Sequence, residues 1–413
     1  MIAGLSCTDT RPSTRRLPTT RYFVSVATVR TGSAATYFPW RHGNRFRLLV
    51  DGEAFFPAML EAIAAARRQV LLEMYLVASG TVMTRFIDAL TAAARRGVRV
   101  CLLFDDFGAY GLAAVDRTAL TRAGCELAFY NPLVISRLRH NLLRDHRKLL
   151  VVDDVCAFVG GAGLTDDFDA ASRGALHWHD LMVEIRGPLV GDWQRVFALN
   201  WRRWAAMPVA TREVDAAAGP QVGRVSLADN KGRAEVRRGL LLQLDRSRRR
   251  AWLATAYFVP SRKLRRRLVR AARRGIDVRL LLPGRHTDVP PVRRAGRRFY
   301  SRLLRAGVRI YEYAPRFQHS KAALVDDWAS IGSSNQDRWN LRWNLEANQE
   351  IDDVEFAEVT AALFQRNFQD SEEIDYHWWR TRPWSTRLAE RFWGAIDRWV
   401  DRRAVGKGRR SGG

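Results

Sequence analysis

Two short apolar runs, residues 149–152 and 322–325, are framed by polar residues at identical spacing. An uninterrupted apolar run of this length is typical of a strand that is buried on both faces. A histidine and a lysine two residues apart precede each run and an aspartate follows it: His146, Lys148 and Asp153 in the first, His319, Lys321 and Asp326 in the second. Side chains at i and i+2 of a strand point to the same side. Each run therefore predicts an imidazole and an ammonium group side by side at one end of a core strand.

The pattern around these runs is also repeated. The apolar segments 71–77 and 252–259 are each followed by a segment with helical character that ends at Gly97 or Gly275, and then by another apolar strand. Further landmarks recur in the same order, and the offsets between the two copies are 173 to 183 residues. The repeat predicts an α/β fold of two related lobes, each with a mixed or largely parallel sheet covered by helices.

Length and charge narrow the class of protein. A chain of 413 residues exceeds what one hydrophobic core usually fills, which agrees with two lobes. Hydrophobic residues at 47% and charged residues at 27% exclude a wholly disordered or collagen-like chain. Lys and Arg number 68 against 43 Asp and Glu, a net charge of +25. This excess indicates a polyanionic partner, namely nucleic acid, an anionic membrane surface or a phosphorylated substrate.

The sequence predicts neither a membrane span nor a metal site. No run approaches the roughly 18 consecutive apolar residues that a spanning helix needs. The arginine-containing residues 1–39 lack the sustained apolar stretch of a secretion signal, so we expect a flexible basic extension. The four cysteines, Cys7, Cys101, Cys125 and Cys156, show no paired metal-ligand spacing. We expect reduced thiols and no metal or cofactor.

Lysine is scarce, and two of the five lysines, Lys148 and Lys321, belong to the repeated motif. An ammonium is a compact point charge that a planar guanidinium does not imitate at a tight phosphate site. Two such charges can stabilise the negative oxygens of a phosphodiester during displacement at phosphorus. One neutral imidazole can attack while the other donates a proton to the leaving alkoxide, and no metal is required. The residues alone leave open which histidine attacks.

The two His-x-Lys-x4-Asp runs resemble the phospholipase D superfamily. The second run is followed by Gly332-Ser333-Ser334-Asn335, as in that superfamily, and then by the segment 344–348. Together with the segments 40–44 and 147–152, these blocks resemble bacterial cardiolipin synthases of the shorter type that lacks N-terminal membrane spans. The resemblance covers about residues 40–370. One departure is Gly163, which stands where the family often has an asparagine.

The resemblance implies one active site between two pseudo-symmetric lobes, with His146 as nucleophile and His319 as general acid and then base. It also implies orienting carboxylates about thirty residues downstream of each histidine. Asp180 lies 34 residues after His146, and Glu346 lies 27 after His319. The predicted catalytic set consists of the two His, Lys and Asp triplets. Within it, we expect Asp153 and Asp326 to form ion pairs that hold the lobe interface and not to take part directly in the chemistry. The expected phosphate-binding residues are Ser333, Ser334 and Asn335.

The expected boundaries are an extension at residues 1–39, lobe 1 at 40–210, lobe 2 at 211–370 and a Trp- and Arg-rich amphipathic helix with a tail at 371–413. The basic runs 246–250 and 262–270 favour binding to an anionic bilayer. In the C-terminal segment, Leu388, Phe392, Ile396, Trp399 and Val400 share one helical face and arginines the other. That helix fits an interfacial anchor and a helix docked on the protein's own core equally well.

The leading functional hypothesis is a cardiolipin synthase that transfers the phosphatidyl group of one phosphatidylglycerol to a second and releases glycerol. A hydrolytic phospholipase D would use the same residues, and a superfamily nuclease would suit the charge. A non-catalytic membrane-binding protein is favoured only by Gly163. Nucleic acid is the less favoured partner, because the C-terminal basic residues coincide with tryptophans at helical spacing. We expect a peripheral protein on the cytoplasmic face of a bacterial inner membrane, and the oligomeric state stays open.

Overall fold

The strand expected after each histidine and lysine is present, as β5 (Lys148–Val152) and β12 (Ala322–Val325). The computed structural model describes residues 37–134, 136, 140–229, 233–335 and 343–382. The predicted extension and most of the predicted C-terminal helix lie outside them.

The first lobe alternates strands and helices before β5 and continues with antiparallel strands after it. Its elements are β1 (Arg41–Val50), α1 (Asp51–Ala65), β2 (Gln69–Met74), α2 (Thr81–Arg95), β3 (Arg99–Asp105), α3 (Ala114–Arg122), β4 (Glu126–Tyr130), β5, β6 (Cys156–Gly160), α4 (Ala170–Arg173), β7 (Leu181–Arg186) and α5 (Leu189–Trp201). Short 3-10 turns lie at His140–Leu142, Asp166–Phe168 and Gly174–Leu176.

The second lobe repeats this order. Its elements are β8 (Gln221–Ala228), α6 (Glu235–Arg246), β9 (Arg250–Ala254), α7 (Arg262–Arg273), β10 (Asp277–Pro283), α8 (Pro290–Arg297), α9 (Tyr300–Leu304), β11 (Arg309–Tyr313), β12, β13 (Trp328–Gly332), β14 (Glu346–Asp352), α11 (Val354–Gln369), β15 (Ser371–Glu373) and α12 (Tyr376–Thr381). The helix before β3 and the helix before β10 both end in a glycine turn, with φ of 86° at Gly97 and at Gly275. A left-handed conformation of this kind favours glycine, which accounts for both landmarks.

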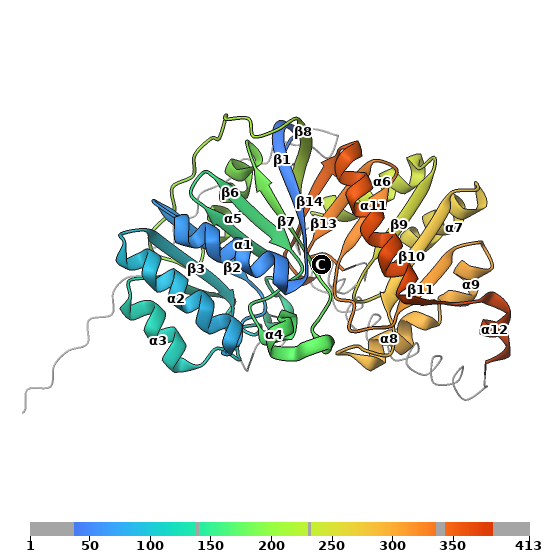
Figure 1. Ribbon diagram of the computed structural model, residues 1–413, viewed down its shortest axis with the longest axis horizontal. Coiled ribbons are helices and arrows are strands. Elements are labelled where there is room, and N and C mark those ends of the chain that lie inside the picture. The colour runs from blue at the N-terminus through green and yellow to red at the C-terminus, as the bar shows by residue number, and fades with distance from the viewer. Residues whose placement is uncertain (1–36, 135, 137–139, 230–232, 336–342, 383–413) are drawn as a thin grey trace, which may run out of the picture. The chain divides into compact units, whose positions relative to one another are not determined.

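All fifteen described strands form one sheet, in the order β15-β11-β10-β9-β12-β13-β14-β8-β1-β7-β6-β5-β2-β3-β4. The lobes join where β1 pairs with β8 (Figure 1). Outward from that pair, both halves run through three antiparallel neighbours to a set of three parallel strands, β2-β3-β4 or β9-β10-β11. The predicted α/β fold of two pseudo-symmetric lobes with mixed sheets is therefore confirmed.

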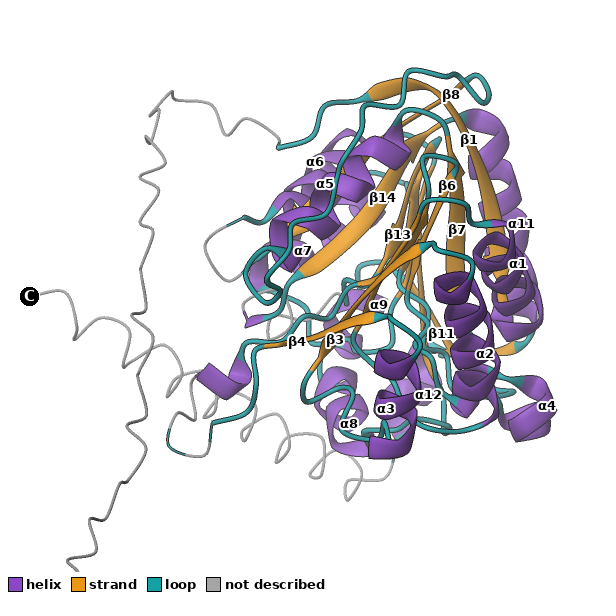
Figure 2. Cartoon of the chain, turned by 90° about the vertical axis from the view of Figure 1, so that its left-hand side faces the viewer, coloured by secondary structure: helices purple, strands orange, loops and turns teal. Residues whose placement is uncertain are grey.

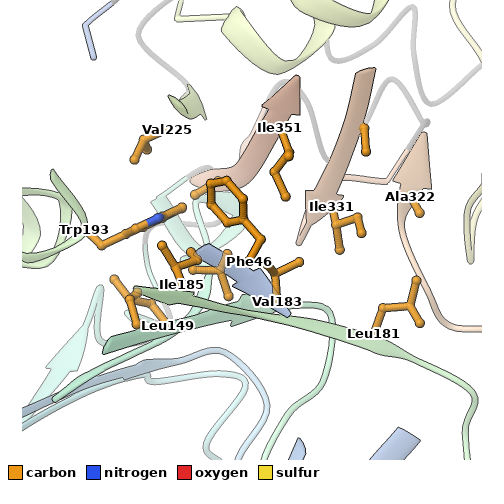
Figure 3. Close-up of a cluster of buried hydrophobic side chains, with 14 of the residues drawn as sticks. Phe46, Leu149, Leu181, Val183, Ile185, Trp193, Val225, Ala322, Ile331 and Ile351 are labelled. Carbon is orange, nitrogen blue, oxygen red and sulfur yellow. The ribbon is translucent and has the colours of Figure 1, made fainter. Parts of the chain in front are cut away.

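Helices cover the sheet on both sides. In Figure 2, α1, α2 and α11 lie on one side of the strands and α5, α6 and α7 on the other. α11 packs on β1 of the first lobe and α5 on β8 of the second, while β7 packs against β13. The central core consequently takes residues from both lobes, including Phe46, Leu149, Trp193, Ile331 and Ile351 (Figure 3). Burial of this shared core fixes the two lobes to each other.

The described part of the C-terminal segment belongs to the second lobe. β15 pairs with β11, and Trp379 of α12 is buried 4.9 Å from Tyr300, ring centroid to ring centroid. This part of the segment therefore docks on the protein's own core. The residues of the predicted amphipathic face, 388–400, lie outside the described residues.

Candidate active site

Each motif histidine is held by a short backbone ladder to the opposite lobe. The His146 amide donates to the Leu345 carbonyl at 3.0 Å, and the His319 amide donates to the His179 carbonyl at 2.9 Å. Leu345 and His179 directly precede the predicted carboxylates Glu346 and Asp180. The ladders thus place each histidine beside the carboxylate of the other lobe.

The side chains complete this exchange. His146 Nδ1 lies 3.0 and 3.1 Å from the two carboxylate oxygens of Glu346, and His319 Nδ1 lies 2.6 Å from Asp180 Oδ2. Both predicted carboxylates contact a histidine, but the pairing within each lobe that the sequence spacing suggested is wrong. Sequence distance misleads here because the contact is made across the lobe interface.

Two buried lysines stand beside the histidines. Lys148 Nζ donates to the His146 carbonyl at 2.6 Å; Lys321 Nζ contacts the His319 carbonyl and lies 3.7 Å from Asp180 Oδ2. Burial and the nearby Lys321 lower the pKa of Lys148 to about 7. Burial also lowers the pKa of Lys321 to about 8, although Asp180 opposes the shift. Two such charges close together and out of water favour an anion between them.

The surroundings keep both histidines neutral in the empty site. Burial lowers the pKa of His146, with Glu346 opposing and Lys148 assisting. Burial and Lys321 lower the pKa of His319 further, to about 3. Although burial alone would raise the pKa of Asp180, the charge of Lys321 and the hydrogen bond with His319 bring it below its usual value. Asp180 therefore stays ionised against the ring of His319.

The Gly-Ser-Ser-Asn segment lies at the carboxyl end of β13, against Glu346. Ser333 Oγ donates to Glu346 Oε2, and the Ser334 amide donates to Asn348 Oδ1 at 3.2 Å. Asn335 is fully buried and accepts a bond from Thr255 Oγ1 at 3.4 Å. Its amide nitrogen has no hydrogen-bond partner among the described residues. A buried donor without a partner is costly and marks a place for a ligand or water oxygen.

The structure gives a reason for Gly163. By strand register it corresponds to Asn335, since β6 ends at Gly160 as β13 ends at Gly332. A Cβ at Gly163 would lie 2.6 Å from the carbonyl oxygen of Leu76, which is held by the Leu164 amide at 2.8 Å. The backbone of the first lobe is therefore too close for an asparagine here, and the amide donor exists in the second lobe alone.

The motif aspartates lie at the other end of β5 and β12, about 16 Å along the strand from the lysines. Asp153 accepts the backbone amides of Arg67, Arg68 and Gln69, and Asp326 accepts those of Arg248, Arg249 and Arg250. Both adopt positive φ, 51° and 52°. The expected ion pairs across the lobe interface are wrong: these carboxylates fix the turn and the start of the neighbouring strand within one lobe, far from the histidines.

Sequence reasoning missed two buried polar networks behind the histidines. Arg147 pairs with Glu73 at 2.6 Å and with Asp145 at 3.0 Å, and Asn200 donates to both carboxylates. On the other side, His179 lies between Asp51 at 2.8 Å and Asn367 at 2.9 Å. Asp145 and Arg147 flank His146 in the sequence, but their partners come from distant elements, so no local signal pointed to them.

One cluster among the described residues has metal-ligand chemistry: Asp51, Glu53 and His177, whose ligand atoms lie within 4.8 Å of one another. Arg316 already pairs with Asp51 Oδ2, and Glu53 is exposed. The cluster lies behind His179 and does not include either motif histidine.

Comparisons with known proteins identify the family of the chain. Residues 59–198 and 240–368 match the family model described as cardiolipin synthase, phospholipase D-like domain. Cardiolipin synthase B of Salmonella typhimurium is 34% identical over 84% of this chain and 86% of its own length. That of Escherichia coli K12 is 35% identical over 77% and 78%.

A solved structure supports the fold. The phosphatidylserine synthase of Haemophilus influenzae matches with a TM-score of 0.68 at 13% identity, over 88% of this chain and 94% of that one. The chain belongs to the cardiolipin synthase family of the phospholipase D superfamily and is an enzyme of this phospholipid-synthesising kind.

Proposed function

We propose that the protein makes cardiolipin by moving a phosphatidyl group from one phosphatidylglycerol to a hydroxyl of a second. The observation that carries the proposal is the pair of neutral histidines, each with its Nδ1 against a carboxylate of the other lobe, beside two buried ammonium groups. A carboxylate on Nδ1 fixes the tautomer and leaves Nε2 for the reaction. The two lysines supply fixed charge for the phosphate oxygens.

In the first step, His146 Nε2 attacks phosphorus and the bond from phosphorus to the glycerol oxygen breaks. His319 takes up a proton at Nε2 when the phosphodiester binds and donates this proton to the glycerol oxygen, so glycerol leaves and a phosphatidyl-histidine remains. The low pKa of His319 belongs to the empty site; a bound phosphodiester adds a negative charge nearby, which raises it. No described residue forms a hydrogen bond with His146 Nε2, whereas Lys321 Nζ lies against the ring of His319, 2.7 Å from Nδ1 and 3.0 Å from Nε2. This difference favours His146 as the nucleophile.

In the second step, a hydroxyl of another phosphatidylglycerol gives its proton to His319 and its oxygen attacks phosphorus. The bond between phosphorus and His146 breaks, which restores both histidines and completes the new phosphodiester. Asn335 Nδ2 and the lysines hold the phosphate oxygens through both steps. If water replaces the acceptor, the product is phosphatidic acid, so transfer requires that the lipid acceptor competes successfully with water.

Relatives of this kind place the protein in membrane-associated lipid metabolism. We further propose a peripheral position on the cytoplasmic face of a bacterial inner membrane, with phosphatidylglycerol as donor and acceptor. None of the described helices has the length and apolar character needed to cross a bilayer.

Lipid product analysis tests the proposal. Purified protein is incubated with phosphatidylglycerol vesicles in EDTA, beside His146→Ala and the matched variant His42→Ala, which changes an exposed histidine on β1. We expect cardiolipin and glycerol from the wild type and His42→Ala, and neither from His146→Ala. Phosphatidic acid alone would identify a hydrolase. Cleavage of DNA without any lipid turnover would identify a nuclease.

A further inference from the structure

The carboxyl ends of the two sets of parallel strands meet at the histidine pair. Lys148 lies opposite Met74 at the end of β2, and Ala322, next to Lys321, lies opposite Ala254 at the end of β9. The loops after these strands therefore lie at the end of the sheet that holds the histidines. In both views, α3 and α8 lie along this edge of the sheet (Figures 1 and 2). We call it the active-site edge.

On the first lobe, this edge exposes large apolar side chains. Tyr110 is 84% exposed, Val115 72% and Phe107 55%. Leu133, Val134 and Leu142 in the loop between β4 and β5 are exposed as well. We call these six residues the apolar rim. Soluble monomers rarely gather exposed apolar groups in one place, and such a patch marks an interaction surface.

The described residues of the apolar rim belong to segments that are hydrogen-bonded to one another and precede His146 in the chain. The Leu133 amide donates to Asp106 at 2.9 Å, which ties the loop after β4 to the loop after β3. Val134 exchanges two hydrogen bonds with Asn141 at 3.0 and 2.8 Å. Leu142 stands four residues before His146. The rim and the nucleophile proposed above are therefore parts of one loop system.

On the second lobe, the same edge is basic. A cavity beside the start of α7 is lined by four arginines: Arg262, Arg265, Arg266 and Arg302. The first turn of α7 has no acidic residue, although helix N-termini favour acidic side chains. Arg285, in the loop after β10, is also exposed on this edge. An apolar rim beside a basic cavity matches the two layers of an anionic bilayer, acyl chains and headgroup phosphates.

We propose that the active-site edge is the surface that docks on an anionic phospholipid bilayer, with the apolar rim inserted among the acyl chains and the arginine cavity on lipid phosphates. This inference rests on the proposed function, because it takes the substrate to be a lipid that stays in the bilayer. In this orientation the end of the sheet that holds the histidines faces the membrane. A phosphodiester then reaches the histidines while its acyl chains remain in the bilayer.

The test compares two double variants of exposed apolar residues. Phe107→Ser with Tyr110→Ser alters the rim, and Val155→Ser with Val354→Ser alters residues that are 53% and 62% exposed at the opposite edge of the sheet. Binding to phosphatidylglycerol vesicles is measured by sedimentation. Turnover is measured on those vesicles and on a short-chain phosphatidylglycerol kept below its micelle concentration.

We expect the rim variant to bind vesicles about tenfold or more weakly and to lose vesicle turnover in proportion, while it turns over the monomeric lipid as the wild type does. The opposite-edge variant should match the wild type in all three measurements. The double variant Arg262→Ala with Arg302→Ala should weaken vesicle binding about fivefold per residue at low salt. The difference in binding from the wild type should shrink at roughly 0.5 M NaCl, where screening is strong.

Unchanged vesicle binding by the rim variant would overturn the inference, as would an equal loss on vesicles and on the monomeric lipid, because that result indicates a defect in the site itself. The proposed chemistry fails separately. If the wild type makes cardiolipin from neither form of phosphatidylglycerol, the proposed function falls, while the sedimentation comparison still decides whether this edge binds the bilayer.

Discussion

His146 and His319 occupy equivalent positions in the two lobes but stand in different surroundings. The ring of His319 lies 5.0 to 5.5 Å, centroid to centroid, from three aromatic rings, those of Phe168, Trp178 and Phe317. Among the described residues, the ring of His146 contacts one aromatic ring, that of Tyr75, at 4.8 Å. Behind His146 lies the charged network of Arg147, whereas the equivalent position in the second lobe is Ser320.

This difference shows how a duplicated backbone can carry unequal chemistry. The shared ladders fix where each histidine points, and the residues around them set its proton affinity. Burial and Lys321 depress the pKa of His319 to about 3, so it holds a proton only when an anion is bound nearby. A histidine of this kind suits proton transfer, and we expect His146, whose ring has fewer aromatic neighbours among the described residues, to attack.

The largest expected effect comes from replacing either histidine, and it compares the roles of the two. We expect His146→Ala and His319→Ala each to reduce turnover by about 10⁴-fold or more. The two histidines act as a unit, so removal of either one removes nearly the whole rate enhancement that the pair supplies. They should differ in what accumulates. When phosphatidylglycerol labelled in its phosphate is added, the His319→Ala protein should slowly accumulate covalently bound label. The His146→Ala protein should accumulate none.

Acid-labile, base-stable label on the His319 variant is the expected signature of a phosphohistidine. Label on His146→Ala, with none on His319→Ala, would reverse the two roles. Equal labelling of both would mean that the surroundings described above do not distinguish the histidines.

The next effect tests the exchange of carboxylates between lobes. We expect Asp180→Asn and Glu346→Gln each to lower turnover by about 100-fold, because each replaces the carboxylate that orients a ring with a neutral amide. The resonances of ¹⁵N-labelled histidine should show which ring is affected. Glu346→Gln should shift His146, and Asp180→Asn should shift His319.

Asp154→Asn serves as a control carboxylate in the turn after β5, where it pairs with Arg68. It should leave both resonances and turnover unchanged. A shift of His146 in Asp180→Asn, with His319 unmoved, would contradict the crossed arrangement and restore pairing within each lobe.

A smaller effect compares Gly163 with Asn335. Gly163→Asn should lower the free energy of unfolding by about 2 kcal/mol, because the added Cβ meets the Leu76 carbonyl. Urea denaturation measures this change, and Gly163→Ala should show most of it, since the clash is at Cβ. Asn335→Ala should instead lower turnover and leave stability nearly unchanged. Increased turnover in a stable Gly163→Asn would show that the first lobe can accept the missing amide.

The sequence was sufficient for the parts of the molecule that depend on local pattern. Strands β5 and β12 follow from apolar runs, and the two lobes follow from the repeated spacing of His146 and His319. The crossed carboxylates could not be predicted in the same way, because a contact across an interface leaves no trace in sequence distance. The sequence showed that Gly163 departs from the asparagine that the family often has. The reason for the glycine is the nearby backbone of Leu76, a tertiary contact that the sequence does not show.

The smallest effect concerns the two lysines and their dependence on pH. Because the pKa values of Lys148 and Lys321 are about 7 and 8, both ammonium groups lose their protons as pH rises through this range. We expect kcat/KM for phosphatidylglycerol to fall above pH 7 by up to about tenfold per unit for each lysine whose charge is required. Stability should change in the opposite direction.

The unfolded chain keeps these lysines protonated up to a pKa of about 10.4, so between about pH 8 and 10 it binds more protons than the folded chain. The free energy of unfolding should therefore rise with pH in that window, by about 1.4 kcal/mol per unit for each lysine. If activity falls while the free energy of unfolding rises, the activity is lost because the lysines lose their charge and not because the protein unfolds. Lys148→Met should remove part of the rise in stability. If activity and the free energy of unfolding both fall above pH 7, the pKa values of the two lysines are not lowered in the folded protein.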